Sequence, residues 1–438
     1  MRDDIVIIGG GLAGSEAAWQ AANRGAKVTL YEMRPKEMTQ AHKTGDLAEL
    51  VCSNSLGSVD PLNAPGILKA EMRRLNSLVI RAAEEARVPA GSALAVDREH
   101  FARAITRALE GHPNIRITRE EVTDVPSDAV SIVATGPLTS EKLSKAIGEL
   151  THAQHLYFFD AISPIIDADS INMKVAYRAS RYGKGGDDYL NCPMDETSYN
   201  TLYEAMLKAE KVQPKEFEKI PYFENCIPIE VMAERGRQTM QFGPLKPVGL
   251  EHPMTGKRPY AVVQLRTENV HGTCYNMVGF QTKMTYPEQR RVFRLIPGLE
   301  QAEFLRLGSL HRNTFINSPQ LLRDTLQLKS RETIFFAGQL VGVEGYTESA
   351  AMGGLAGINA ARRLAGQPLV TPPPTSAHGC LMAHIVKSDP KHFQPMNTNF
   401  GLFPPVSIKT RDKEQKRRLM QQRALEDFDA WIAQSRLS

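Results

Sequence analysis

The chain has 438 residues, of which 42% are hydrophobic and 23% are charged, and its net charge at pH 7 is +4. These values are typical of a globular protein of two or three domains, and they exclude a chain that is basic along its whole length. The five cysteines are few, odd in number and far apart, with no Cys-x-x-Cys pair. A disulfide framework and a metal site are therefore not expected.

No apolar run approaches the roughly 18 residues that a membrane span requires. The first apolar run, Ile5–Ile8, is also too short for the core of a signal peptide and leads directly into glycines. By elimination, we expect a cytoplasmic protein that does not contact a membrane.

The N-terminal segment has the order strand, glycine turn, helix, strand. Ile5–Ile8 predicts a buried parallel strand, residues 15–24 an alanine-rich helix, and Lys27–Tyr31 a second strand. Further along, the hydrophobic spacing predicts one long amphipathic helix over 66–86. Further elements are predicted at Asp97–Leu109 (helix), Ala129–Ala134 (buried strand), Ala261–Leu265 and Tyr275–Phe280 (more polar strands), Thr333–Ala337 (buried strand), Ser349–Leu364 (helix) and a charged helix from about Thr410.

The turn after the first strand has the spacing Gly-x-Gly-x-x-Gly. In this pattern one glycine permits a tight turn, one lets the backbone approach a pyrophosphate, and one lets helix and strand pack closely. Glu32 ends the second strand, where an acid binds the two hydroxyls of a ribose. The sequence therefore predicts a dinucleotide site that contains Gly9, Gly10, Gly11, Leu12, Ala13, Gly14 and Glu32.

The position of the later elements favours FAD over a nicotinamide cofactor as the bound dinucleotide. A matching strand and helix return only near the C-terminus, after a long insertion, as in large flavoproteins. A helix that begins near Glu348 would direct its positive end at the flavin pyrimidine. We find no second Gly-x-Gly-x-x-Gly after a strand, so NADH or NADPH would bind as reductant without a Rossmann domain of its own.

The predicted fold class is α/β, with a Rossmann-type FAD-binding domain like that of glutathione reductase and an inserted mixed α/β domain. We assign residues 1–165 to the first part of the FAD-binding domain and 166–317 to the inserted substrate or tRNA domain. Residues 318–370 are assigned to the return segment and 371–438 to a C-terminal linker and basic helical tail.

Two cysteines lie in irregular segments where a thiol is accessible. Cys52 follows the second strand in a polar loop, and Cys226 precedes Ile-Pro in the insertion. A thiolate there can add to an electron-poor double bond, although a buried, inert role is the more common one for any single cysteine. Cys192 and Cys274 are interpreted as structural.

The chain resembles one family along nearly its whole length. The motifs are Gly9–Gly14, Glu32–Pro35, Ala48–Ser55, Val96–Arg98, Ala134–Ser140, Tyr189–Met194, Pro244–Leu250, Val278–Thr282, His311–Thr314 and Gly342–Tyr346. Together they resemble the folate- and FAD-dependent tRNA uracil-5-methyltransferases, the TrmFO family. The resemblance implies formation of 5-methyluridine at position 54 of the tRNA T loop, with 5,10-methylenetetrahydrofolate as carbon donor and NADH or NADPH as reductant.

The resemblance also implies residue roles. Cys226 would add to uracil C6, and Cys52 would either assist loss of the C5 proton or resolve the adduct. The cofactor site would extend to Met33, Arg34, Thr135, Gly136, Gly338, Gln339, Gly345 and Tyr346. Where many flavoproteins have Gly-Asp, this chain has Gly338-Gln339, whose amide can still bind the ribityl chain or a phosphate. His311 and Arg312 are candidates for folate contact, with an ordinary surface pair as the alternative.

The C-terminal segment carries a basic run that includes Lys409, Lys416, Arg417 and Arg418. Such a run is usually a solvated helix face, but beside Lys283, Arg290, Arg291 and Arg294 it would form a surface for the tRNA T arm. No obligatory protein partner is evident.

Three other functions stay open at this stage. The first is GidA-type modification of the tRNA wobble uridine, although that family has a long additional C-terminal helical domain. The second is a small-molecule flavin oxidoreductase, which would not need the basic tail. The third is a tRNA-binding or folding factor that has kept a flavin without using it.

Overall fold

The computed structural model describes most of the chain. The described residues are 2–39, 41–151, 156–161, 163–183, 186–212, 227–269, 271–308, 310–391, 393–406 and 412–437. Within these ranges, no helix is both long and apolar enough to cross a membrane.

A six-stranded sheet forms the centre of the FAD-binding half. Its strand order is β16-β17-β7-β1-β2-β6, and every pairing except that of β16 with β17 is parallel. The strands are β1 (Asp4–Ile8), β2 (Lys27–Tyr31), β6 (Ile115–Thr118), β7 (Val130–Val133), β16 (Gln327–Leu328) and β17 (Arg331–Phe336). β1 is fully buried along Ile5–Ile7, as expected for a parallel strand that is covered on both faces. The predicted Rossmann-type class is confirmed.

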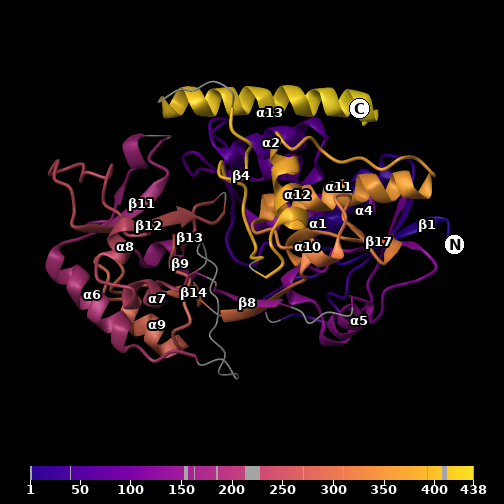
Figure 1. Cartoon of the computed structure of the whole chain (residues 1–438). Helices are drawn as coiled ribbons and strands as arrows, with labels where there is room; N and C mark the ends of the chain where they lie inside the picture. Colours follow the sequence, from indigo (N-terminus) through magenta and orange to yellow (C-terminus); the bar gives the residue numbers. More distant parts are fainter. Residues whose placement is uncertain are drawn as a thin grey trace.

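The inserted segment builds a second, largely antiparallel sheet around its own core. Its strand order is β10-β11-β12-β13-β9-β14, and helices pack beside it (Figure 1). The strands are β9 (Ile165–Asp167), β10 (Tyr177–Arg178), β11 (Tyr189–Met194), β12 (Ala261–Thr267), β13 (Cys274–Met277) and β14 (Phe304–Arg306). The helices are α6 (Glu196–Lys208), α7 (Ile229–Glu234), α8 (Thr239–Phe242) and α9 (Tyr286–Phe293).

Two smaller sheets and the remaining helices complete the described structure. One sheet has the order β3-β5-β4, and β8 pairs antiparallel with β15. In Figure 1, β8 lies between the two large sheets. The elements are β3 (Ser55–Ser58), β4 (Arg87–Val88), β5 (Ala93–Val96), β8 (Leu156–Ala161), β15 (Leu310–Phe315), α2 (Ala64–Arg74), α3 (Leu78–Glu85), α4 (Arg98–Glu110), α5 (Glu141–Thr151), α10 (Ser318–Leu321), α12 (Ala377–Lys387) and α13 (Lys413–Ser435).

The prediction of one long helix over 66–86 is wrong, because the chain forms two helices there. Asn76 adopts the left-handed conformation, with φ of 55°, and this ends the path of α2. Ser77 then caps α3, because its hydroxyl accepts a hydrogen bond from Ile80 N at 3.2 Å. Apolar residues on both sides of the break face the same core, so the hydrophobic spacing alone did not reveal it.

The C-terminal helices are attached to α2. The Glu71 carboxylate accepts hydrogen bonds from the backbone N–H groups of Ala377 and His378, and it lies 2.7 Å from His378 Nδ1. All three groups are buried. The ring of His378 stacks on Phe428 of α13, which runs along the outer edge of the molecule over α2 (Figure 1). The helix α12 was not predicted from the sequence.

Two helices from opposite ends of the chain touch through glycines. Gly353 and Gly357 of α11 (Tyr346–Leu364) lie against α1 (Leu12–Ala22). A Cβ atom at Gly357 would collide with the carbonyl oxygen of Ala17, and one at Gly353 with that of Ala13. The helix α11 can therefore approach α1 this closely only because these positions have no side chain.

We predict that Gly357→Ala lowers the midpoint of thermal unfolding. The added methyl group forces the two helices apart, and overpacking of this kind costs about 1–3 kcal/mol. Gly354→Ala is the matched control, because its Cβ would meet nothing closer than Glu16 Cγ at 3.5 Å. The control should be neutral or stabilising by up to about 1 kcal/mol, since alanine favours a helix. Equal midpoints for the two variants would contradict the close contact.

Candidate functional site

The glycine turn joins the end of β1 to the start of α1. Gly9 has φ of +102°, and a Cβ there would lie 2.7 Å from both Ala134 O and Thr135 Cα, at the end of β7. At Gly14 a Cβ would collide with Gly9 O. At Gly11, in contrast, a Cβ would meet nothing within 4 Å, so this backbone faces open space. Two glycines thus serve packing, and one exposes the backbone.

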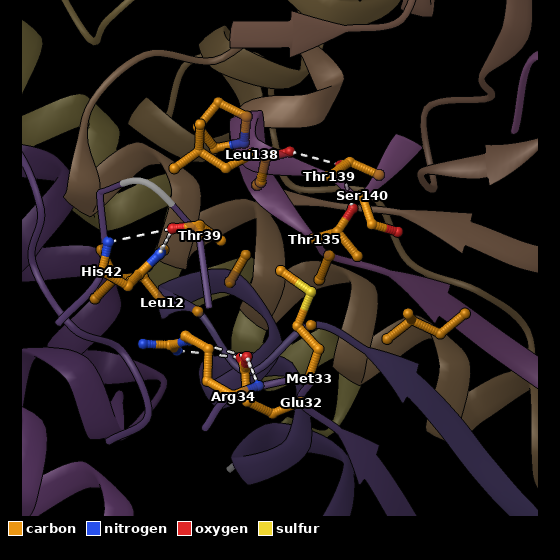
Figure 2. A pocket seen from close by; sticks show the side chains of 18 of the residues that line it. Leu12, Glu32, Met33, Arg34, Thr39, His42, Thr135, Leu138, Thr139 and Ser140 are labelled. Carbon is orange, nitrogen blue, oxygen red and sulfur yellow. Dashed lines mark hydrogen bonds and ion pairs between the residues drawn. The ribbon is translucent and has the colours of Figure 1, made fainter. Parts of the chain in front are cut away.

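The turn opens into a pocket with about 1020 Å³ of empty space. This volume includes solvent-exposed space at the mouth of the pocket. Glu32 and Arg34 lie on one side and Thr135, Leu138 and Thr139 on the other (Figure 2). Other lining residues are Gly9, Gly11, Leu12, Ala13, Met33, Thr39, His42, Glu49, Val51, Gly136, Gly338, Gln339, Tyr346 and Ser349.

The late segment reaches the same pocket from the far end of the chain. After β17, Gly338 takes φ of +76°, and a Cβ there would lie 2.7 Å from Ala13 Cβ. Gly345, with φ of +107°, then precedes α11, whose first turn lines the pocket through Tyr346 and Ser349. Neither α1 nor α11 has a side-chain hydrogen-bond acceptor at its N-cap. Two uncapped, positive helix ends therefore border one cavity.

These features fit FAD. A pyrophosphate requires free backbone N–H groups at a helix N-terminus, and Gly11 and α1 provide them beside open space. The second helix end suits an electron-rich ring system. The residues that would hold FAD are therefore the Gly9–Gly14 turn, Thr135–Gly136, Gly338–Gln339 and the start of α11. Among the described residues, no cluster of three or more His, Cys, Asp or Glu side chains could hold a metal ion.

Glu32, predicted to bind a ribose, is fully engaged within the protein. Oε1 accepts from the backbone N and Nε of Arg34 at 3.0 and 2.9 Å. Oε2 accepts from Gly10 N at 3.0 Å and from Arg34 Nη2 at 3.1 Å (Figure 2). A carboxylate has about four acceptor sites, so all of them are occupied. A ribose hydroxyl can bind Glu32 only by sharing or displacing one of these donors.

Arg34 is the largest fully buried side chain in the described structure. Its guanidinium also donates to Glu49 Oε2 at 3.1 Å, so one cation is held by two carboxylates. Burial alone would raise the pKa of Glu32, but the hydrogen bonds and charge of Arg34 outweigh it and keep that pKa below its usual range. Burial, followed by the charge of Arg34, lowers the pKa of His42 to about 4, so this ring is neutral at pH 7.

The Cys52 loop is held next to the pocket by the first residue of α11. The phenol oxygen of Tyr346 accepts hydrogen bonds from Cys52 N at 2.7 Å and from Ser53 N at 3.1 Å. Burial raises the pKa of the Tyr346 phenol, so the hydroxyl keeps its hydrogen and can still donate it. Cys52 is partly exposed, and Val51 lines the pocket. The structure therefore brings Cys52 and Tyr346 together.

The same loop is also held by the inserted domain. Arg266 of β12 donates to Asn54 Oδ1 at 2.9 Å and to Ser53 Oγ at 2.8 Å. Arg98 of α4 donates to Leu50 O at 2.9 Å and pairs with Glu268 at 2.7 Å. No sequence pattern assigns a role to Arg98, Arg266 or Glu268. The one sequence signal among these three residues is that Arg98 belongs to the family motif Val96–Arg98.

The outcome for the remaining predicted residues differs from one to the next. Cys226 and Lys409 lie outside the described residues. His311 and Arg312 belong to β15, where their backbones pair with Asp160 and Phe159 of β8. Lys416, Arg417 and Arg418 are exposed on the first turns of α13, and Arg418 pairs with Glu414 at 2.7 Å. Cys192 is buried, as expected for a structural cysteine.

We predict that Glu32→Gln destabilises the protein before any cofactor is added. The amide cannot accept four hydrogen bonds or neutralise Arg34, and breaking a buried ion pair from one side costs about 3–5 kcal/mol. Denaturant unfolding of the apoprotein measures this loss, and fluorescence titration should show weaker FAD binding as well. Glu37→Gln, an exposed neighbour in the next turn, is the control. An apoprotein of unchanged stability would show that the Glu32–Arg34 pair contributes little.

The chain matches a known protein family and individual members of it. The family described as "Glucose inhibited division protein A" matches residues 4–368. Methylenetetrahydrofolate–tRNA-(uracil-5-)-methyltransferase TrmFO of Geobacter sulfurreducens is 57% identical over 99% of this chain and 100% of its own length. The protein of the same name from Aquifex aeolicus is 57% identical over 100% of this chain and 98% of its own.

The fold is shared with a more distant protein of known structure. GidA of Aquifex aeolicus superposes with a TM-score of 0.69 at 18% identity, over 99% of this chain and 78% of that chain. This likeness concerns the fold alone, whereas the 57% identity extends over essentially the whole chain. The chain therefore belongs to the glucose inhibited division protein A family and, within it, to the TrmFO group of methylenetetrahydrofolate–tRNA-(uracil-5-)-methyltransferases.

Proposed function

We propose that the chain transfers a one-carbon unit from 5,10-methylenetetrahydrofolate to C5 of a uridine in tRNA, with FAD and NADH or NADPH supplying electrons. The observation that carries this proposal is the 57% identity to two TrmFO proteins over 99–100% of the chain. The pocket with two uncapped helix ends supports the flavin part. We further propose that the target is uridine 54 in the T loop.

The overall reaction needs a reductant for a simple reason. The methylene group of the folate has the oxidation level of formaldehyde, and a methyl group is two electrons more reduced. One hydride from NAD(P)H, passed on through FAD, makes up this difference. The uridine gives up its C5 proton, a second proton comes from solvent, and tetrahydrofolate and NAD(P)⁺ are the other products.

Uracil C5 is a poor nucleophile until another group adds to C6. A cysteine thiolate is suited to this addition near neutral pH, and we propose Cys226 for it. Cys52 is proposed as the second functional cysteine, which either assists loss of the C5 proton or resolves the adduct. Its support is its place in the loop held by Tyr346 beside the cofactor pocket. The base must leave its stack to reach such a site.

The remaining substrate contacts are proposed from a sequence motif and from exposed charge. We keep His311 and Arg312 as candidates for folate contact from their motif alone. Lys416, Arg417 and Arg418 are exposed, as a tRNA-binding surface requires. If they contact phosphates, replacing all three with glutamine should raise the KM for tRNA and leave kcat unchanged. An unchanged KM would show that these three residues only form a solvated helix face.

We predict that the purified protein forms 5-methyluridine in unmodified tRNA when it is given methylenetetrahydrofolate, FAD and NADH. Mass spectrometry of digested tRNA measures the product, and a transcript with cytidine at position 54 is the matched control. Formation of 5-methyluridine in the control transcript would show that the enzyme methylates another uridine. Absence of product in both, with oxidation of NADH alone, would favour a small-molecule oxidoreductase.

We predict that tRNA with 5-fluorouridine at the target forms a denaturant-resistant complex with the protein. Fluorine cannot leave as a proton does, so the adduct at C6 persists. Cys226→Ala should abolish the complex and the methylation while FAD stays bound. Cys274→Ala is the control, because burial raises the pKa of that thiol to about 11 and leaves it unreactive at pH 7. A trapped complex that persists in Cys226→Ala and maps to Cys52 would reassign the nucleophile.

A further inference from the structure

A second cleft lies between α4 and the inserted domain. Ile165, Glu268, Cys274 and Arg306 line it on the inserted side, and residues of α4 and of the 43–50 segment line the other side. It contains about 2480 Å³ of space and opens to solvent. Glu49 lines both this cleft and the cofactor pocket, so the two cavities meet there.

Arg306 is a charged group without a partner in the part of the chain that the structure describes. It ends β14, its side chain is largely buried, and it makes no hydrogen bond or ion pair with any described residue. Burial, and next the positive charge of Arg98, lowers the pKa of Arg306. Arg98 differs, because Glu268 binds it with both carboxylate oxygens, at 2.7 and 3.2 Å.

Lys43 adds a third positive charge from the other side of the cleft. Lys43, Arg98 and Arg306 all line the same cleft. Burial, followed by the charges of Arg306 and Arg98, lowers the pKa of the Lys43 ammonium group. The two nearest carboxylates are already engaged, Glu268 by Arg98, and Glu49 by Arg34 and by the backbone N–H groups of residues 43 and 44. These three cations therefore outnumber the two carboxylates by one, and Asp46, Asp97, Glu99 and Glu110 line the rest of the cleft.

Such an excess is costly when one of the cations is largely buried, because neither water nor a counter-charge compensates it fully. Cys52 and Tyr346 are among the groups that influence the pKa of Arg306, so Arg306 lies near the Cys52 loop. An anion that binds at the meeting point of the two cavities would relieve the repulsion. It would then lie beside Cys52, one of the two cysteines proposed to act on the target base.

We propose that Lys43 and Arg306, next to the Glu268-bound Arg98, bind a backbone phosphate of the tRNA next to the target uridine. This inference rests on the proposed function. The shape of the cleft favours a nucleic acid over the carboxylates of a folate. Two more arginines of α4 line the cleft. At 1.5 Å per residue, Arg103 lies about 8 Å and Arg107 about 14 Å from Arg98, and Arg103 pairs with the exposed Glu99 at 3.0 Å. A strand with regularly spaced phosphates can follow this line, whereas a single carboxylate pair cannot.

The first test measures tRNA affinity without turnover. Arg306→Gln and Lys43→Gln should each raise the Kd for tRNA roughly tenfold, as expected for loss of one charge-assisted hydrogen bond. Each should also reduce the slope of log Kd against log salt by about one. Arg116→Gln, an exposed arginine of β6 that does not line the cleft, is the control and should change neither quantity. FAD content and the unfolding midpoint show whether Arg306→Gln folds, and Lys43 is exposed enough to be replaced without that concern.

The second test locates the phosphate. A T-arm RNA with uncharged methylphosphonate linkages on both sides of the target uridine should bind the wild-type protein about tenfold more weakly. Arg306→Gln should bind this RNA as tightly as the wild-type protein does, because the phosphate that Arg306 would contact is already uncharged. If the effects of the two changes on Kd instead add, the phosphate bound by Arg306 is not next to the target uridine. An unchanged Kd for tRNA with a raised KM for methylenetetrahydrofolate would assign the site to the folate carboxylates instead. No change in either would leave Arg306 without a binding role. Failure of the proposed function is distinct, because the wild-type protein would then form no 5-methyluridine.

Discussion

The close contact between α1 and α11 is the constraint on which the site depends. The two helices lie more than 300 residues apart in the chain, and they touch where Gly353 and Gly357 meet the backbone of α1. This contact puts the N-terminus of α11 beside the glycine turn and completes the pocket. Because Tyr346 is the first residue of α11, the same contact sets the position of the Cys52 loop.

Residues from three distant parts of the chain hold the Cys52 loop, and each binds a different kind of group in it. Tyr346 accepts from its backbone N–H groups, Arg98 donates to its carbonyls, and Arg266 binds the side chains of Ser53 and Asn54. Arg266 and Glu268 belong to the inserted domain, so the loop is also part of the seam between the domains. A reactive loop benefits from such support, because precise placement of a functional group depends on the residues behind it.

Two arginines near the pocket illustrate how charge balance separates structural groups from candidate binding groups. Arg34 is buried more deeply than Arg306, but it is held by two carboxylates, and Glu32 has no acceptor site left over. Arg306 has the opposite arrangement, with cations nearby and no bonded partner among the described residues. The first pattern stabilises the fold, and the second is the one expected where a ligand supplies the missing charge.

The sequence by itself determined the Rossmann-type class, the glycine turn, the position of Glu32 directly after β2 and the return of a buried strand and helix near the C-terminus. These depend on local patterns, namely apolar runs, glycine spacing and periodicity, which act over a few residues. It did not show the break at Asn76, the helix α12 or the pairing of Glu32 with Arg34. The clustering of Lys43, Arg98 and Arg306 was equally invisible, since these residues come from three separate segments. Only the tertiary structure decides such features, because bonding and charge compensation depend on distances in space that no local pattern contains.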